Sequence, residues 1–385
     1  MTRPSSTKSG YLPSLDGWRT VAILSVICFH DSVHRVGFFS TSFLHTYGDL
    51  GVDLFFAISG ILICSRLLEE ERTTGRISLR GFYIRRFFRI SPAAWTFLIT
   101  YLLLAVVRLL PMDYGGVITG FLMVRNFWVH VAGDVPRTWY TIHFWSLSVE
   151  EQFYLLLPSL LLLGKKRRSV LLASLSFAFV LRVGIVMHFP SLQVPAVWIR
   201  TDMRLHALLI PAWFAVLLGK QRIKKFAIQW LRPWIVLSLF VLAIIFLSSG
   251  GNKLLTLRAL LAIPVGFPLI VISTMLHPGS LLTRLLETWP MRFVGRISYS
   301  LYLWQQLFFF NDHTPAHWPF AVLQTFPSNY LAAFVCALAS YYLIEKPLIR
   351  VGHRLAPPVS PGHQDLLEPS AIEGNKPVTV TANSA

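Results

Sequence analysis

The sequence predicts an all-α fold, a polytopic bundle of about ten helices that cross a membrane. Three observations predict it. The 385 residues are 54% hydrophobic and only 14% charged, whereas soluble domains carry about 25% charged residues. The apolar residues gather in long runs, and the basic residues lie in short segments between those runs. This pattern is typical of membrane proteins, whose loops hold the charge.

About ten apolar stretches are long enough to span a bilayer. They are approximately 18–36, 50–68, 91–110, 144–163, 169–189, 204–219, 233–249, 258–276, 294–311 and 322–344. A further apolar run at 115–131 is interrupted by Arg125 and Asn126. We interpret that run as re-entrant or interfacial.

The placement of the cations predicts topology. A net charge of +17 raises the alternative of a nucleic-acid partner, but cytoplasmic loops of membrane proteins also carry an excess of Lys and Arg. With the N-terminus inside, the basic segments 72–89, 165–168 and 220–225 all become cytoplasmic. We therefore expect both termini in the cytoplasm, a lipid bilayer as partner and no nucleic acid.

Three segments follow one another along the chain. Residues 1–10 are polar, 11–350 form the expected membrane domain, and 351–385 have no apolar period and are expected to be a disordered cytoplasmic tail. The three cysteines (Cys28, Cys64 and Cys336) lie in apolar runs without metal-ligand spacing or a disulfide framework. No metal cofactor is expected.

The first candidate site contains Asp16, Arg19 and His30. Arg19 and His30 are eleven positions apart, which on an α-helix is about three turns, roughly 16 Å of rise and about 20° of rotation. An ionisable side chain within a membrane span is costly, so His30 is a functional candidate. The alternative is a helix cap, a loop cation and a tolerated polar residue. A neutral histidine can accept a proton or carry an acyl group.

The second candidate is the basic segment that contains Arg85, Arg86 and Arg89. Arg86 and Arg89 are three apart and share a helix face. Paired guanidinium groups bind phosphate well. Ordinary cytoplasmic cations are the alternative, although the phenylalanines between the arginines indicate that the segment packs.

Other candidates lie at the expected helix ends and inside one span. Glu150 and Glu151 begin a span, and Glu150 shares a face with Tyr154. The alternative to a functional role is that the two glutamates only stabilise the start of a helix, where acidic side chains are favoured. Asp202 and Arg204 lie at the outer end of a span. They form either a local ion pair or part of a site for an acceptor. Tyr299 is one of several hydroxyl-bearing residues along a span. Tyr154 and Tyr299 are candidates for substrate binding, and helix packing is the alternative for Tyr299.

Together these segments resemble the membrane-bound acyltransferase 3 family, of the sugar O-acetyltransferase type. The resemblance covers residues 11–350. It rests, in order, on YLPSLDGWRTVA followed by FH, GVDLFFAISGILI, FYIRRFFRISPA, FWSLSVEEQFYLLLP, DMR and GRISYSLYLW. The ordered set is specific, although each piece alone is weak.

The resemblance implies an activity and its parts. It implies acyl-coenzyme A as donor, most commonly acetyl-coenzyme A, bound on the cytoplasmic side by Arg86, Arg89 and the adjacent Arg85. It implies a carbohydrate or other hydroxyl acceptor, a multi-pass protein of the bacterial inner membrane, and the stand-alone form without an extracellular hydrolase-like domain. His30 would act as general base or transient acyl carrier, oriented by Asp16, Arg19 and one of the two glutamates.

One position departs from the family pattern. Many members have a histidine directly after the YLW triplet, where this chain has Gln305. A role for a second histidine is absent there, which leaves His30 as the main candidate for proton transfer. The rival class is a transporter or flippase, whose buried charges line a path. The sequence shows neither an internal repeat nor a pair of Gly/Pro-interrupted spans that would favour it, and it leaves the oligomeric state open.

Overall fold

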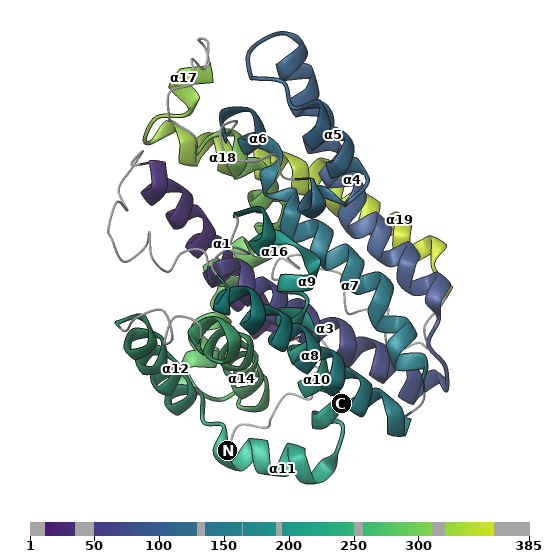
Figure 1. The fold of residues 1–385 in the computed structure, drawn as a ribbon. Coiled ribbons are helices and arrows are strands. Elements are labelled where there is room, and N and C mark those ends of the chain that lie inside the picture. Colours follow the sequence, from purple (N-terminus) through teal and green to yellow (C-terminus); the bar gives the residue numbers. More distant parts are fainter. Residues whose placement is uncertain are drawn as a thin grey trace, which may run out of the picture.

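The computed structural model describes residues 12–34, 50–128, 135–163, 165–189, 195–249, 257–309 and 320–357. Within these ranges the regular structure is helical throughout, without a strand (Figure 1). The N-terminal segment 1–10 and almost all of the expected tail lie outside the described residues.

A helix forms at each of the ten apolar stretches. The ten are α1 (Pro13–His34), α3 (Leu50–Thr74), α4 (Leu79–Val106), α7 (Phe144–Leu162), α8 (Lys165–His188), α10 (His206–Leu218), α12 (Pro233–Ser248), α14 (Ile263–Leu276), α16 (Trp289–Trp304) and α18 (Ser328–Ser340). Short elements connect them: α5 (Tyr114–Phe121), α6 (Val135–Ile142), α9 (Thr201–Arg204), α11 (Gln221–Trp230), α15 (Leu281–Leu286) and α17 (Phe320–Leu323).

The last helix extends beyond its apolar stretch. α18 passes through a π-helical turn at Tyr341–Glu345 into α19 (Lys346–Leu355). Hydropathy alone placed the end near 344, because the residues that follow are basic. Their backbone hydrogen bonds continue the helix regardless of side-chain polarity.

Four helical segments in the described ranges are long and apolar enough to cross a membrane. They are Leu50–Thr74, Leu79–Val106, Arg167–His188 and Ser328–Leu355. A fifth is added if α11 and α12, bent by 77° at their junction, form one broken span. The chain is therefore a multi-pass helical membrane protein, while ten crossings and cytoplasmic termini stay predictions.

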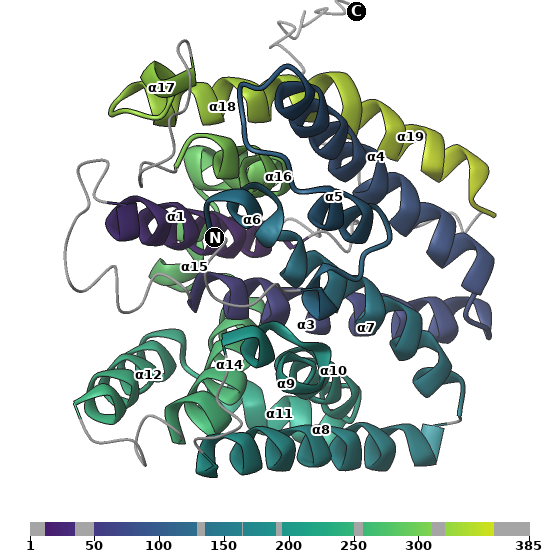
Figure 2. The same cartoon turned by 45° about the horizontal axis from the view of Figure 1, so that its top comes forward.

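α1 and α3 lie at the centre of the bundle (Figure 2). They pack against each other, and α16 and α10 cover their outer sides. Glycines make the approach close: a Cβ on Gly295 of α16 would lie 1.9 Å from the Asp16 carbonyl oxygen, and one on Gly17 2.3 Å from that of Leu286. Close packing on several sides fixes α1, which carries both Arg19 and His30.

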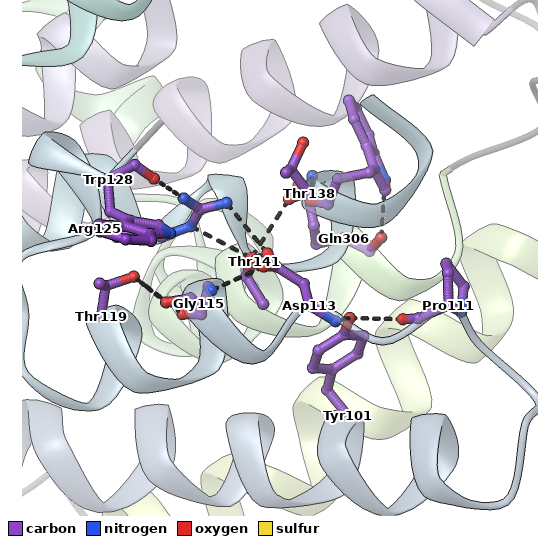
Figure 3. A network of polar contacts seen from close by, with 12 residues as sticks. Tyr101, Pro111, Asp113, Gly115, Thr119, Arg125, Trp128, Thr138, Thr141 and Gln306 are labelled. Carbon is purple, nitrogen blue, oxygen red and sulfur yellow. Dashed lines mark hydrogen bonds and ion pairs between the residues drawn. The ribbon is translucent and has the colours of Figure 1, made fainter. Parts of the chain in front are cut away.

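The described part of the interrupted run, up to residue 128, contains a short helix, α5, followed by a 3₁₀ turn at Arg125–Phe127. Arg125 is fully buried and forms an ion pair with Asp113 at 3.2 Å, while the Thr141 hydroxyl donates to the same carboxylate at 2.7 Å (Figure 3). Asp113 also caps α5 by accepting from the Gly116 amide at 2.8 Å. This network satisfies Arg125 inside the protein, so the charge that interrupts the apolar run becomes part of the packing.

Candidate active site

His30 and Gln305 meet where the end of α1 lies beside the turn that follows α16. His30 lies near the end of α1, and Gln305 follows α16 in the 3₁₀ turn Gln305–Leu307. The His30 Nδ1 lies 2.8 Å from the Gln305 Oε1. Gln305 is fully buried, and the His30 ring packs edge-on against Trp139, with 5.2 Å between the ring centroids.

A chain of amide hydrogen bonds sets the orientation of Gln305. The Gln306 Nε2 donates to the Trp139 carbonyl at 2.9 Å, so the Gln306 Oε1 is free to accept from the Gln305 Nε2 at 3.0 Å. The Gln305 oxygen therefore points at His30. An amide oxygen can only accept, so the proton of a neutral His30 ring lies on Nδ1. The lone pair lies on Nε2, which is then the basic atom.

A cavity of about 110 Å³ adjoins His30. Its polar lining side chains come from four separate segments of the chain: His30, His143, Arg204, and the pair Tyr302 and Gln306. Val26, Phe29, Val52, Ile142 and Trp145 complete the wall. A small, mostly apolar cavity with a few convergent polar groups is the usual form of a site for a small ligand or reacting group.

Arg204 places a positive charge at this cavity. It forms an ion pair with Asp53 at 3.3 Å and donates to the Trp198 carbonyl at 2.8 Å, and its guanidinium lies 5.2 Å from the Trp145 ring centroid. Asp202, its neighbour in sequence, points elsewhere and pairs with Arg200 and Arg182. The structure thus brings Arg204 to the cavity, and the two residues do not act as one pair.

The predicted basic segment lies on α4. Arg85 forms an ion pair with Glu70 at 3.4 Å, and Arg89 pairs with the buried Glu345 at 3.3 Å. The Arg86 guanidinium lies 4.6 Å from the centroid of the Tyr154 ring. Arg86 is thus held by an aromatic face rather than by a carboxylate.

Arg19 and Arg66 join this segment from α1 and α3. Arg19 pairs with the buried Asp16 at 3.5 Å and lies within electrostatic range of Arg86 and Arg89. Arg66 lies within range of the same cations. We call Arg19, Arg66, Arg85, Arg86 and Arg89 the arginine cluster. The sequence interpretation missed Arg66 because it was assigned to the end of a span; its charge inside an apolar run was the available signal.

The glutamates and tyrosines lie beside the arginine cluster. Glu150 accepts from the hydroxyls of Tyr154 and Ser59, and Glu151 lies within electrostatic range of Arg86. The Tyr299 hydroxyl donates to the Ile90 carbonyl at 2.8 Å. Tyr154 and Tyr299, candidates for substrate binding, thus lie beside the arginine cluster.

His143 is a cavity residue that the sequence interpretation missed. It lies in the link between α6 and α7, directly before the FWSLSVEEQ motif. Its side chain is 3% exposed. A lone histidine in an aromatic stretch offered little signal, because its approach to His30 depends on folding. Among the described residues, no group of three or more His, Cys, Asp or Glu side chains is arranged to hold a metal ion.

Comparison with known proteins identifies the class. The chain matches the acyltransferase 3 model, described as an acyltransferase domain, over residues 12–346. It therefore belongs to this acyltransferase family, which confirms the family predicted from the motifs.

Two staphylococcal relatives illustrate the match. The provisionally named O-acetyltransferase SACOL0978 of Staphylococcus aureus strain COL is 32% identical over 336 residues, 77% of this chain and 50% of that protein. O-acetyltransferase OatA of Staphylococcus aureus strain NCTC 8325 / PS 47 is 32% identical over 372 residues, 89% of this chain and 58% of that protein. The chain thus spans about half the length of these curated relatives. No solved structure matches it significantly.

Proposed function

We propose that this protein is an integral membrane O-acyltransferase that moves an acyl group, acetyl in the first instance, from acyl-coenzyme A to a hydroxyl of a carbohydrate or related acceptor. The observation that carries the proposal is His30: its ring adjoins a small cavity and is bound at Nδ1 by a fixed amide oxygen. Membership of the acyltransferase 3 family and the O-acetyltransferase names of the relatives support it.

His30 is the proposed base. With the Nδ1 proton bound to Gln305, the Nε2 lone pair takes the proton of the acceptor hydroxyl. The hydroxyl oxygen bonds to the thioester carbon, the carbon–sulfur bond breaks, and the proton passes to the departing thiolate. In the alternative route, Nε2 first bonds to the thioester carbon and displaces the thiolate. The acceptor hydroxyl then bonds to the acyl carbon, the bond to Nε2 breaks, and the hydroxyl proton neutralises the thiolate. Both routes need the same tautomer of the ring.

The arginine cluster is the proposed donor site. Its guanidinium groups suit the phosphates of coenzyme A. Arg66 and Arg86 are the best placed, because Arg85 and Arg89 already pair with glutamates. Arg19 and His30 lie at opposite ends of α1, separated by roughly 16 Å of helix rise. The pantetheine arm would run along this path and carry the thioester to His30.

The topology that we propose follows from the separation of the arginine cluster from His30 along α1. The donor is cytoplasmic, so the arginine cluster would face the cytoplasm and the His30 cavity the opposite side. About ten crossings, cytoplasmic termini and a bacterial inner membrane agree with the distribution of basic segments. Reagents that label single cysteines introduced at 8 and at 376 from one side only would test the position of the termini.

Replacement of His30 tests the proposal. His30→Ala should reduce acyl transfer about 10²–10⁴-fold, the usual contribution of a positioned general base, while the protein still inserts in the membrane. Purified protein in detergent, labelled acetyl-coenzyme A and a panel of oligosaccharides provide the assay. Because detergent removes the two compartments, label transfer also distinguishes an enzyme from a transporter.

A matched control is available at His277, whose ring nitrogens each lie 3.0 Å from a backbone carbonyl oxygen, of Ser273 and of Ile228. His277→Ala should retain transfer. Near-normal transfer by His30→Ala would show that His30 is not the base.

A further inference from the structure

His143 lines the same cavity as His30, and its ring nitrogens have no hydrogen-bond partner in the described part of the chain. The side chain is 3% exposed, and neither Nδ1 nor Nε2 is bound within the described residues. A neutral imidazole always carries one N–H and one lone pair. An unsatisfied buried donor is destabilising, so such a group in a native protein needs an explanation.

Aromatic packing holds the His143 ring in this position. The ring centroid lies 4.8 Å from that of Phe144, 5.1 Å from Phe97 and 5.7 Å from Tyr302, and each contact is edge-on or nearly so. The backbone is also fixed, because the His143 carbonyl accepts from the Tyr302 hydroxyl at 3.1 Å. The ring is therefore preorganised without a polar partner of its own.

Neighbouring polar groups at the cavity are already bound to the protein. Arg204 pairs with Asp53, Gln306 binds Trp139 and Gln305, and Tyr302 binds His143 and Ser146. A ligand in the cavity would thus find the hydrogen-bonding capacity of His143 unused.

The cavity limits the size of that ligand. An apolar cavity of about 150 Å³ holds one benzene molecule, which has six heavy atoms. On this scale the volume here, about 110 Å³, holds on the order of four heavy atoms. An acetyl group with its thioester sulfur has that size.

We propose that His143 donates a hydrogen bond to the carbonyl oxygen of an acetyl-sized acyl group held in this cavity beside His30. The inference rests on the proposed function and adds a residue and an acyl size to it. As the acceptor oxygen bonds to the carbonyl carbon, the carbonyl oxygen gains negative charge, which the His143 N–H stabilises. His143 keeps its proton throughout; His30 takes the hydroxyl proton and returns it to the thiolate as the carbon–sulfur bond breaks.

Ligand binding tests this contact without knowledge of the acceptor. The probes are coenzyme A and acetonyl-coenzyme A, which has the carbonyl but no thioester bond to break. The wild type should bind acetonyl-coenzyme A more tightly than coenzyme A. His143→Phe should weaken acetonyl-coenzyme A about tenfold, the value of one hydrogen bond, and leave coenzyme A unchanged. A ketone analogue with a longer chain should gain nothing over coenzyme A.

Stability separates this role from a structural one. Phenylalanine has a similar shape and removes an unsatisfied polar group, so the Tm of His143→Phe should equal or exceed that of the wild type. His143→Gln keeps an N–H donor and serves as a second variant, which should retain part of the preference for acetonyl-coenzyme A. The exposed His188 provides the control, and His188→Phe should change neither affinity.

The outcomes distinguish the two proposals. Equal losses for both probes, or no loss for either, in His143→Phe would overturn the role of His143 and leave the proposed function intact. Failure of the wild type to bind coenzyme A at all would overturn the donor assignment, and the His143 proposal with it.

Discussion

At the scale of single residues, the tautomer of His30 depends on Gln305. Gln305 provides an acceptor whose direction is fixed by the hydrogen bonds that run through Gln306 to the Trp139 carbonyl. A histidine in that position could be donor or acceptor, whereas this amide presents only oxygen to Nδ1. Gln305 therefore holds the His30 ring in the tautomer that can accept a proton at Nε2.

Replacement of Gln305 measures the value of this contact. Gln305→Met keeps the length of the side chain and removes the acceptor, so kcat should fall about fivefold, the effect of one net hydrogen bond of about 1 kcal/mol. The KM for the donor should change little. Gln305→Glu should recover part of the rate, because a carboxylate also accepts from Nδ1.

The pH–rate profile provides the second measurement. A carboxylate at 305 stabilises the imidazolium, so the acid limb of the Gln305→Glu profile should move to higher pH. Wild-type kcat in Gln305→Met, together with an unmoved acid limb in Gln305→Glu, would show that Gln305 does not position His30.

At the scale of elements, α1 is held by glycines on its neighbours and by its own. Gly295 lets α16 approach until a Cβ there would lie 1.9 Å from the Asp16 carbonyl oxygen. The contact is between backbones, which cannot rotate out of the way as a side chain can. The axial position of α1, and with it His30, therefore depends on this crossing.

Gly295→Ala should disturb the crossing. Overpacking typically lowers the free energy of unfolding by about 1–3 kcal/mol, so thermal unfolding in detergent should show a lower Tm, accompanied by a loss of acyl transfer. Gly279 is the matched control, because it is exposed and a Cβ there meets nothing within 4 Å. An unchanged Tm in Gly295→Ala would mean that the two helices can separate at little cost.

The sequence predicted the elements well and their meeting points poorly. A helix forms at each of the ten predicted apolar stretches. Burial requires sustained hydrophobicity, whether lipid or protein covers the helix. They could not pair α1 with α16, since that depends on glycine approach and not on hydropathy. For the same reason the sequence did not single out His143.

At the scale of the whole molecule, the polar groups form two separate centres. The arginine cluster gathers side chains from α1, α3 and α4. The cavity is lined by His30, His143 and Arg204. His30 lies toward the end of α1 opposite to Arg19 of the arginine cluster. Under the proposed function, the first centre binds the donor and the second performs the transfer.

Separated centres predict separated kinetic effects. Arg66→Gln and Arg86→Gln should raise the KM for acetyl-coenzyme A about 10–100-fold, since a hydrogen bond to a charged group contributes about 1.5–3 kcal/mol. The kcat should stay within a few-fold of the wild type, because neither residue adjoins His30. Initial rates at varied donor concentration provide the measurement.

Arg72 is the matched cation for this experiment. It lies at the end of α3, largely exposed and paired with Glu69, so Arg72→Gln should leave both constants unchanged. If the Arg66 and Arg86 variants lowered kcat at unchanged KM, the arginine cluster would belong to the chemistry rather than to donor binding.

The contact between His30 and Gln305 has a consequence for the order of synthesis. The two residues are 275 positions apart, so the helix that carries the proposed base leaves the ribosome well before its acceptor. Until α16 has been inserted beside α1, the imidazole has no fixed amide to define its proton. Partly synthesised or partly inserted chains would therefore be inactive. Activity would begin only once α16 has packed beside α1.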